Sequence, residues 1–216
     1  MDKLDYKKEY KDLYLPGKKP VIVEVPQMIF IQVSGRGNPN VSESYQEAIA
    51  LLYGLSFTIK MSKMNGTQPE GYFEYVVPPL EGLWKMTDIN GKVCEPDFQN
   101  KDNFEWISMI RQPEFVTEDV FEKAKTSLAK KKPELDVSRA HFVIWKEGLC
   151  CQLLHKGAYD DEPETLSIMN AFLEESEYRT DFSETRLHHE IYLSDPRKCK
   201  TENLKTVIRH PVRKIK

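Results

Sequence analysis

The sequence has no apolar run long enough to cross a membrane. A spanning helix needs about 18 consecutive apolar residues, and no stretch approaches this length. The first residues, MDKLDYKKEYKDLY, are polar and charged, unlike a secretory signal. We therefore expect a cytoplasmic protein without a membrane partner.

Clustered ligands for a metal or for disulfides are also missing. The four cysteines, at positions 94, 150, 151 and 199, show no CxxC spacing. Adjacent residues of a strand point to opposite faces, which separates Cys150 from Cys151 and His188 from His189. We expect reduced thiols, no metal site and no cofactor.

Basic charge is not in surplus, and familiar catalytic signatures are absent. The chain has 31 Lys and Arg against 34 Asp and Glu, a net charge of -3. A protein that binds duplex DNA usually carries a basic face, so we expect no nucleic-acid partner. GxGxxG, Walker, GxSxG and HExxH motifs do not occur, which argues against the common enzyme classes.

What is present is an ordinary globular composition, 40% hydrophobic and 30% charged, arranged in a clear order of elements. VIVEVPQMIFIQVS (21–34) predicts a strand, and VSESYQEAIALLYGL (41–55) predicts a helix with Ser42 as its N-cap. GYFEYVVPP (71–79) and LEGLWKMTDI (80–89) then predict two strands.

The same order returns in the second half of the chain. LCCQLLHKG (149–157) predicts a strand, DEPETLSIMNAFLEE (161–175) a helix, and LHHEIYLSDP (187–196) and LKTVIRHPV (204–212) two strands. Between the repeats, 103–113 and 139–148 read as strands, and a helix begins after Thr117.

These patterns predict an α+β fold in one domain, residues 1–216, with an internal repeat at about 27–89 and 149–210. Each unit needs its own helix to cover an apolar sheet face, so we expect two strand-helix-strand-strand modules related by a pseudo-twofold axis. The antiparallel sheets would carry their helices on one side, with a ligand cleft between the modules.

The stretch HHEIYLSDPR (188–197) alternates between two faces and places a carboxylate in mid-strand. Glu190 shares its face with Tyr192. One interpretation is a solvated residue, since a half-buried antiparallel strand exposes every second side chain. The other is a buried anchor in a cavity lined by aromatic residues of both repeats. Alternation alone leaves both open.

Several stretches resemble the GyrI-like (gyrase-inhibitor-like) small-molecule-binding family over nearly the whole chain. They are YVVPPLEGLW (75–84), FEWISMIRQPEFVT (104–117), LLHKGAYDDEPET (153–165), and HHEIYLSDPRK followed by NLKTVIRHPV. The resemblance implies tandem modules with the ligand held between them, and a cavity glutamate on the penultimate strand, which matches Glu190. Tyr75, Trp84 and Trp106 stand in the family's aromatic motifs.

Some stand-alone members that this chain resembles hydrolyse cyclopropane-bearing genotoxins. The resemblance therefore implies a hydrolase. In a workable mechanism Glu190 orients or deprotonates the attacking water, and a tyrosine hydroxyl, of Tyr192 or of Tyr75, donates to the carbonyl oxygen that gains charge. The alternative is a non-catalytic module that sequesters planar aromatic or cationic drugs, or that shields a protein partner such as gyrase. The register of the strand that would carry Tyr75 also stays open, since a slip of one residue reverses its face.

We predict that the purified protein shows no sequence-specific binding to duplex DNA, because residues 1–20 are too short and too charged for a helix-turn-helix. A gel-shift assay at moderate salt tests this. A shift that survives added salt and depends on DNA sequence would contradict the prediction.

Overall fold

In the computed structural model, which describes residues 3–87, 90, 92–94, 101 and 104–215, the chain forms a mixed α and β fold. No helix among these residues is both long and apolar enough to span a membrane. In chain order the elements are α1 (Tyr6–Glu9), α2 (Lys11–Tyr14), β1 (Val21–Arg36), α3 (Glu43–Lys60), η1 (Met61–Asn65), β2 (Leu80–Thr87), β3 (Val93–Cys94), β4 (Glu105–Gln112), α4 (Glu118–Lys131), η3 (Val137–Arg139), β5 (His141–Lys156), η4 (Tyr159–Asp161), α5 (Glu162–Glu175), β6 (Tyr178–Thr180), β7 (His188–Tyr192), η5 (Thr201–Asn203) and β8 (Lys205–Lys214).

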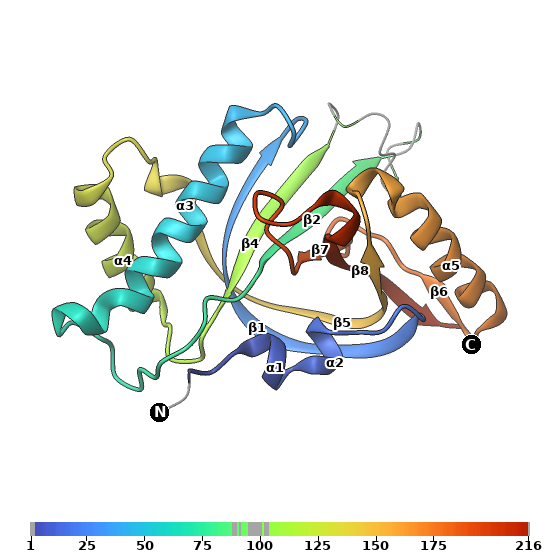
Figure 1. The fold of residues 1–216 in the computed structure, drawn as a ribbon, viewed down its shortest axis with the longest axis horizontal. Coiled ribbons are helices and arrows are strands. Elements are labelled where there is room, and N and C mark those ends of the chain that lie inside the picture. The colour runs from blue at the N-terminus through green and yellow to red at the C-terminus, as the bar shows by residue number, and fades with distance from the viewer. Residues whose placement is uncertain (1–2, 88–89, 91, 95–100, 102–103, 216) are drawn as a thin grey trace.

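Six strands pair edge to edge in a closed ring. β1 lies between β4 and β5, β5 pairs with β8, β8 with β7, β7 with β2, and β2 returns to β4. Every pairing is antiparallel, as expected from the sequence. Figure 1 shows the long β1 and β5 curving along the lower side of the ring. Closure pairs both edges of each of these strands, so their backbone donors and acceptors are used inside the protein.

Apart from the short strands β3 and β6, the chain order is β1-α3-β2-β4 in the first half and β5-α5-β7-β8 in the second. The strand expected at 71–79 is not formed, since its only bridge pairs Tyr75 with Leu4. Pro78 and Pro79 have no N–H to donate to a ladder, which explains the failure. The first unit therefore ends with β4, beyond residue 89. A pseudo-twofold relation of the units stays a prediction.

One long strand replaces the two that were expected at 139–148 and 149–157. β5 continues through Gly148, whose φ of 78° lets the strand bend without ending. Val25 pairs with Gly148 and Gln27 with Lys146, so the bend lies opposite Pro26. The composition around Gly148 resembles a turn, but pairing with β1 on both sides of it keeps the strand continuous.

The helices begin where side-chain caps predict. The Ser42 hydroxyl accepts a hydrogen bond from Tyr45 N at the start of α3, 3.3 Å away. Thr117 does the same for Val120 N at the start of α4. Each cap satisfies a backbone donor that would otherwise have no partner, which fixes the first turn.

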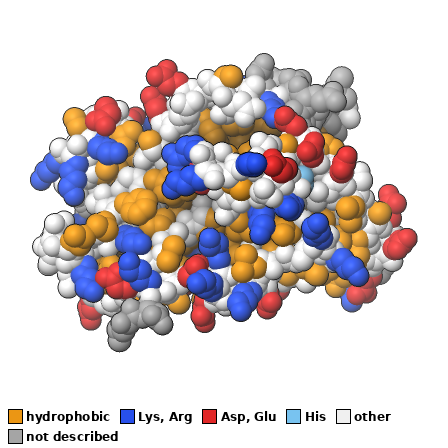
Figure 2. Space-filling model, viewed as in Figure 1, with side chains coloured by type: hydrophobic (Ala, Val, Ile, Leu, Met, Phe, Trp, Pro, Cys, Tyr) orange, Lys and Arg blue, Asp and Glu red, His pale blue; other side chains and the backbone are white. Residues whose placement is uncertain are grey.

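The ring has an apolar interior and two apolar regions outside it. All six strands contribute to the interior cluster, which Leu13 and Tyr14 of α2 also join. Outside, α3 and α4 pack on β1 and β4, and α5 packs on β5 and β8. The helices of the two units thus pack on the outer side of the sheet, whereas α2 inserts Leu13 and Tyr14 into the interior. On the face in Figure 2, basic and acidic side chains are interspersed.

A buried network of charges crosses the interior. Arg209 Nη1 donates to Glu147 Oε2 at 2.8 Å, and the two ring nitrogens of His189 each lie 3.0 Å from a carboxylate, of Glu147 and of Glu81. Burial alone would lower the pKa of His189, but these carboxylates outweigh it and raise the pKa to about 9. Tyr14 of α2 donates to Glu81 and completes the network.

We predict that Glu147→Gln lowers the free energy of unfolding by about 3–5 kcal/mol, because it leaves the buried charges of Arg209 and His189 without their shared partner. Urea denaturation measures the change. The matched control is Glu24→Gln, which removes an exposed pair with Lys146 and should change stability by about 1 kcal/mol or less. Equal, small losses in both variants would contradict the prediction.

Candidate functional site

β7 places its side chains alternately inside and outside the ring. His189 points into the charged interior network, so His188, Glu190 and Tyr192 lie on the outer face. Glu190 is only 5% exposed. The alternative of a solvated surface glutamate is therefore wrong, and the expectation of a buried carboxylate is confirmed.

Glu190 is held by an imidazole and a phenol. His188 Nε2 lies 3.2 Å from Glu190 Oε1, while His188 Nδ1 lies 2.7 Å from His210 Nε2 on β8. Burial, the charge of Glu190 and a hydrogen bond to it raise the pKa of Tyr192 well above its usual value. The phenol therefore stays protonated and can donate to Glu190.

Three further aromatic side chains lie around Glu190 and Tyr192. Trp84 Nε1 donates to the Tyr192 hydroxyl at 3.2 Å, and the Trp84 ring lies 5.9 Å from that of Tyr45 on α3. Tyr159, just before α5, meets Tyr192 edge to face at 5.8 Å. Burial raises the pKa of Tyr45 and of Tyr159 to about 12. The sequence argument named Trp84 and Tyr192 but missed Tyr45 and Tyr159.

Trp106 lies one layer behind this group. It pairs with Trp84 across β4 and β2, and its ring is 4.9 Å from Tyr45 in an edge-to-face contact. A Cβ on Gly35 would lie only 2.3 Å from the Trp106 ring, so that glycine gives the indole its space. Trp106 is 1% exposed, and its contacts are those of a core residue that supports Tyr45.

Tyr75 is not brought to Glu190. Its ring packs among Tyr72, Phe73 and Phe115, with Lys60 Nζ 5.8 Å from its centroid. Because 71–79 forms no strand, the question of its register does not arise. The expectation that Tyr75 shares a ligand wall with Trp84 finds no support in this arrangement.

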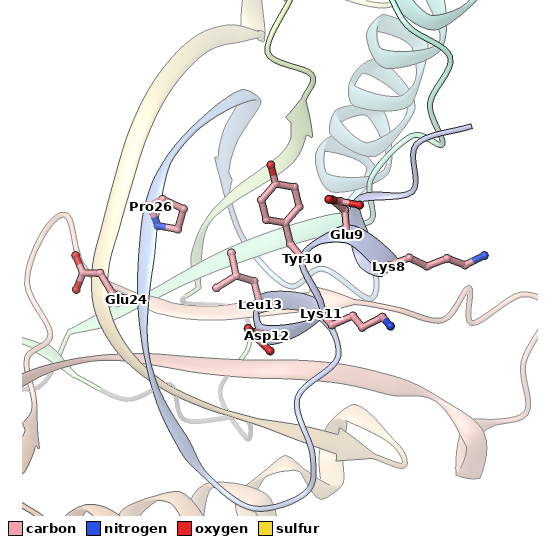
Figure 3. Close-up of a pocket in the computed structure, with 8 residues that line it drawn as sticks. All are labelled: Lys8, Glu9, Tyr10, Lys11, Asp12, Leu13, Glu24 and Pro26. Carbon is pink, nitrogen blue, oxygen red and sulfur yellow. The ribbon is translucent and has the colours of Figure 1, made fainter. Parts of the chain in front are cut away.

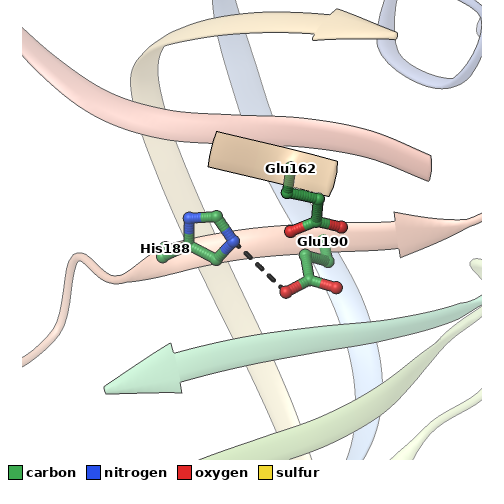
Figure 4. Close-up of side chains that lie close together, drawn as sticks. All are labelled: Glu162, His188 and Glu190. Carbon is green, nitrogen blue, oxygen red and sulfur yellow. Dashed lines mark hydrogen bonds and ion pairs between the residues drawn. The ribbon is translucent and has the colours of Figure 1, made fainter. Parts of the chain in front are cut away.

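A second carboxylate completes the cluster around Glu190, and sequence reasoning missed it. Glu162, the first residue of α5, is fully buried, and among the residues that the structure describes neither of its carboxylate oxygens has a hydrogen-bond partner. One atom each of Glu162, His188 and Glu190 lie within 4.8 Å of one another (Figure 4). Burial, and then the charge of Glu190, raise the pKa of Glu162 well above its usual value.

A surface pocket lies elsewhere, between the N-terminal helices and β1 (Figure 3). Its lining consists of residues 8–13 with Glu24 and Pro26. These side chains are mostly charged, and none of them belongs to the cluster around Glu190. A ligand could reach Glu190 only if neighbouring side chains moved, because the residue is nearly sealed from solvent.

The chain is similar to one protein family and to several solved structures. A family model of the GyrI-like small molecule binding domain matches residues 18–213. A conserved protein from Listeria innocua superposes with a TM-score of 0.90 at 45% identity, covering 98% of this chain and 100% of that chain. A hydrolase from Listeria innocua gives a TM-score of 0.87 at 44% identity with the same coverage.

A more distant likeness concerns the fold alone. The EcmrR C-terminal domain has a TM-score of 0.51 at 13% identity, covering 91% of this chain and 98% of that domain. No curated protein matches the sequence.

We predict that Gly82→Ala disturbs the site without unfolding the protein. A Cβ there would lie 3.0 Å from both Trp84 Nε1 and the Tyr192 hydroxyl, so one of the two must move and their hydrogen bond should lengthen or break. Near-UV circular dichroism and tryptophan emission should change while far-UV circular dichroism stays native. Gly17→Ala, whose nearest neighbour is 4.0 Å away, is the control, and identical spectra for both variants would refute the prediction.

Proposed function

The chain belongs to the GyrI-like small-molecule binding domain family, and from this premise we propose that it binds flat apolar or cationic molecules beside Glu190. We further propose that it hydrolyses ligands that carry a strained cyclopropane ring, and so detoxifies genotoxins. The observation that carries the proposal is the burial of Glu190 between His188 and Tyr192. A buried carboxylate is costly for stability and therefore favours a functional explanation.

In this mechanism Glu190 takes a proton from water while the water oxygen bonds to a ring carbon. The ring C–C bond breaks, and its electron pair moves through the conjugated system to a carbonyl oxygen. Tyr192 stabilises that oxygen by turning its O–H from Glu190 toward the ligand, which also makes Glu190 a stronger base. Trp84 Nε1, which donates to the Tyr192 oxygen, keeps this hydroxyl in place.

The surroundings of Glu190 suit a planar ligand. Trp84, Tyr45 and Tyr159 offer aromatic surface on both sides of the Tyr192 hydroxyl. We propose that the ligand enters between the two units, near the first turns of α3 and α5, and that Trp106 supports the wall from behind. A dry aromatic site positions the ligand and strengthens the hydrogen bonds to it.

The relatives support hydrolysis as a reaction class. Two hydrolase structures from Listeria innocua are each 44% identical to this chain and are covered completely by it. We propose that the protein acts in the cytoplasm, without a nucleic-acid or membrane partner.

A non-catalytic drug-binding module is the second candidate. Two buried carboxyl groups, Glu162 and Glu190, lie together, and a cationic ligand beside them would favour their ionised forms and pair with them. Such a module would sequester its ligand without turnover, or shield a protein partner such as gyrase.

We predict that Glu190→Gln retains binding of a neutral planar ligand but loses most turnover, because the amide keeps the shape of the side chain and removes its basicity. Mass spectrometry of a cyclopropane-containing alkylator after incubation measures the hydrated product. Glu164→Gln changes an exposed residue two positions after Glu162 and is the control, with unchanged turnover expected.

The outcomes separate the two candidates. Full hydrolysis by a correctly folded Glu190→Gln protein would eliminate the proposed mechanism. If the parent protein yields no product and the variant binds cationic ligands less tightly, the non-catalytic module is supported instead.

A further inference from the structure

Glu162, His188 and Glu190 bring three buried donor groups together from two elements. His188 and Glu190 are two residues apart on β7 and so share its outer face. Glu162 arrives from the first residue of α5, and Figure 4 shows its carboxylate directed toward that of Glu190. His188 Nε2 lies 3.2 Å from Glu190 Oε1, and one possible ligand atom of each of the three side chains lies within 4.8 Å of the others.

Glu162 lacks a compensating partner. Both of its oxygens are buried without a hydrogen bond among the described residues, and the neighbouring group is a second carboxylate. Lys101 exerts a favourable charge on Glu162, but its ammonium pairs with Asp160 at 2.5 Å. Two carboxylates in such a place call for a positive charge between them.

His188 is prepared to offer a lone pair. Its Nδ1 meets His210 Nε2 at 2.7 Å, and Phe182 packs against the His210 ring at 4.9 Å. With a metal ion at Nε2, the His188 proton would lie on Nδ1 and be donated to His210 Nε2. Without an ion, Nε2–H can donate to Glu190 Oε1 instead. Metal-binding histidines commonly use the second ring nitrogen in this way, which fixes the orientation of the ring.

We propose that Glu162, His188 and Glu190 bind one divalent transition-metal ion of the Zn²⁺ class. Two carboxylates and one neutral imidazole balance the charge of the ion and leave a fourth position for water, as in catalytic zinc sites. Ligand atoms about 2.0–2.2 Å from the ion would lie roughly 3.5 Å apart, so the 4.8 Å separation must shrink. Glu162 can make this movement because no hydrogen bond holds its carboxylate.

The donor set also discriminates between ions. An imidazole among two carboxylates suits Zn²⁺ and Co²⁺, whereas Mg²⁺ and Ca²⁺ prefer six or more oxygen ligands. The inference does not rest on ring hydrolysis, although a bound ion would lower the pKa of its water and could provide the nucleophile in place of Glu190.

The test uses the full chain, freed of metal with a chelator and titrated with ZnCl₂ or CoCl₂ in a calorimeter. We expect one ion per chain with a micromolar or lower dissociation constant, and no binding of Mg²⁺ at millimolar concentration. Glu162→Gln should weaken Zn²⁺ binding at least about 100-fold, while Glu164→Gln should bind like the parent. The melting temperature of the parent should rise with Zn²⁺ and that of Glu162→Gln should not.

An anomalous-scattering map from a Zn²⁺-soaked crystal of the parent decides the question should Glu162→Gln fail to fold. A peak within bonding distance of all three side chains supports the site. Absence of a peak there, or equal affinity in the parent and Glu162→Gln, overturns it. Measuring ring hydrolysis on the metal-free sample keeps the two proposals apart, because hydrolysis without ion binding rejects only the metal site, and ion binding without hydrolysis rejects only the hydrolase.

Discussion

The buried contacts of His189 with Glu147 and Glu81 determine how β7 sits in the ring, and the site follows from them. β7 has only five residues, so apolar burial alone specifies its register weakly. His189 meets a carboxylate at each ring nitrogen, and this fixes which residues of β7 face inward. A slip by one residue would carry Glu190 into an interior that already holds two carboxylates. The inner network therefore keeps Glu190 on the outer face.

The two faces of β7 differ in how their charges are compensated. Inside the ring, the carboxylates of Glu81 and Glu147 pair with two cations, His189 and Arg209. Because its charges are balanced, this network is accounted for by a structural role. Outside, Glu162 and Glu190 lie together, and the neighbours described around them include an imidazole and phenols. Buried charge without a structural counter-charge is typical of sites that act on a ligand, and this contrast separates the functional cluster from the stabilising one.

Sequence reasoning reached the features that depend on local pattern. Alternation along 188–194 gave the shared face of Glu190 and Tyr192, and cap chemistry gave the starts of α3 and α4. Sequence reasoning failed where pairing between strands distant in the sequence determines the structure. Pairing with β1 keeps β5 continuous through Gly148, and the two prolines leave 71–79 without a ladder, which moves Tyr75 away from the site.

Sequence reasoning could not identify Glu162 as a site residue, for a different reason. An acidic residue in the first turn of a helix is ordinarily explained by the helix dipole, and its sequence signal is the same whether it is solvated or buried. Only the packing of α5 against the ring brings it to β7. Tyr45 is a similar case, because its spacing in α3 marks a core position and does not reveal that Trp84 lies beside it.

The ends of β1 and β5 indicate where the sealed site can open. Gly37 and Gly157 follow these strands, both with positive φ, of 108° and 141°. The N–H of Gly37 donates to Phe104 O just before β4, and that of Gly157 donates to Leu204 O just before β8, so the two turns are built alike. Each turn leads into a helix whose first residues carry a site side chain, Tyr45 or Glu162. The paired ring therefore positions Glu190, and the helices that follow these two similar turns bring Tyr45 and Glu162 to it from the two halves of the chain.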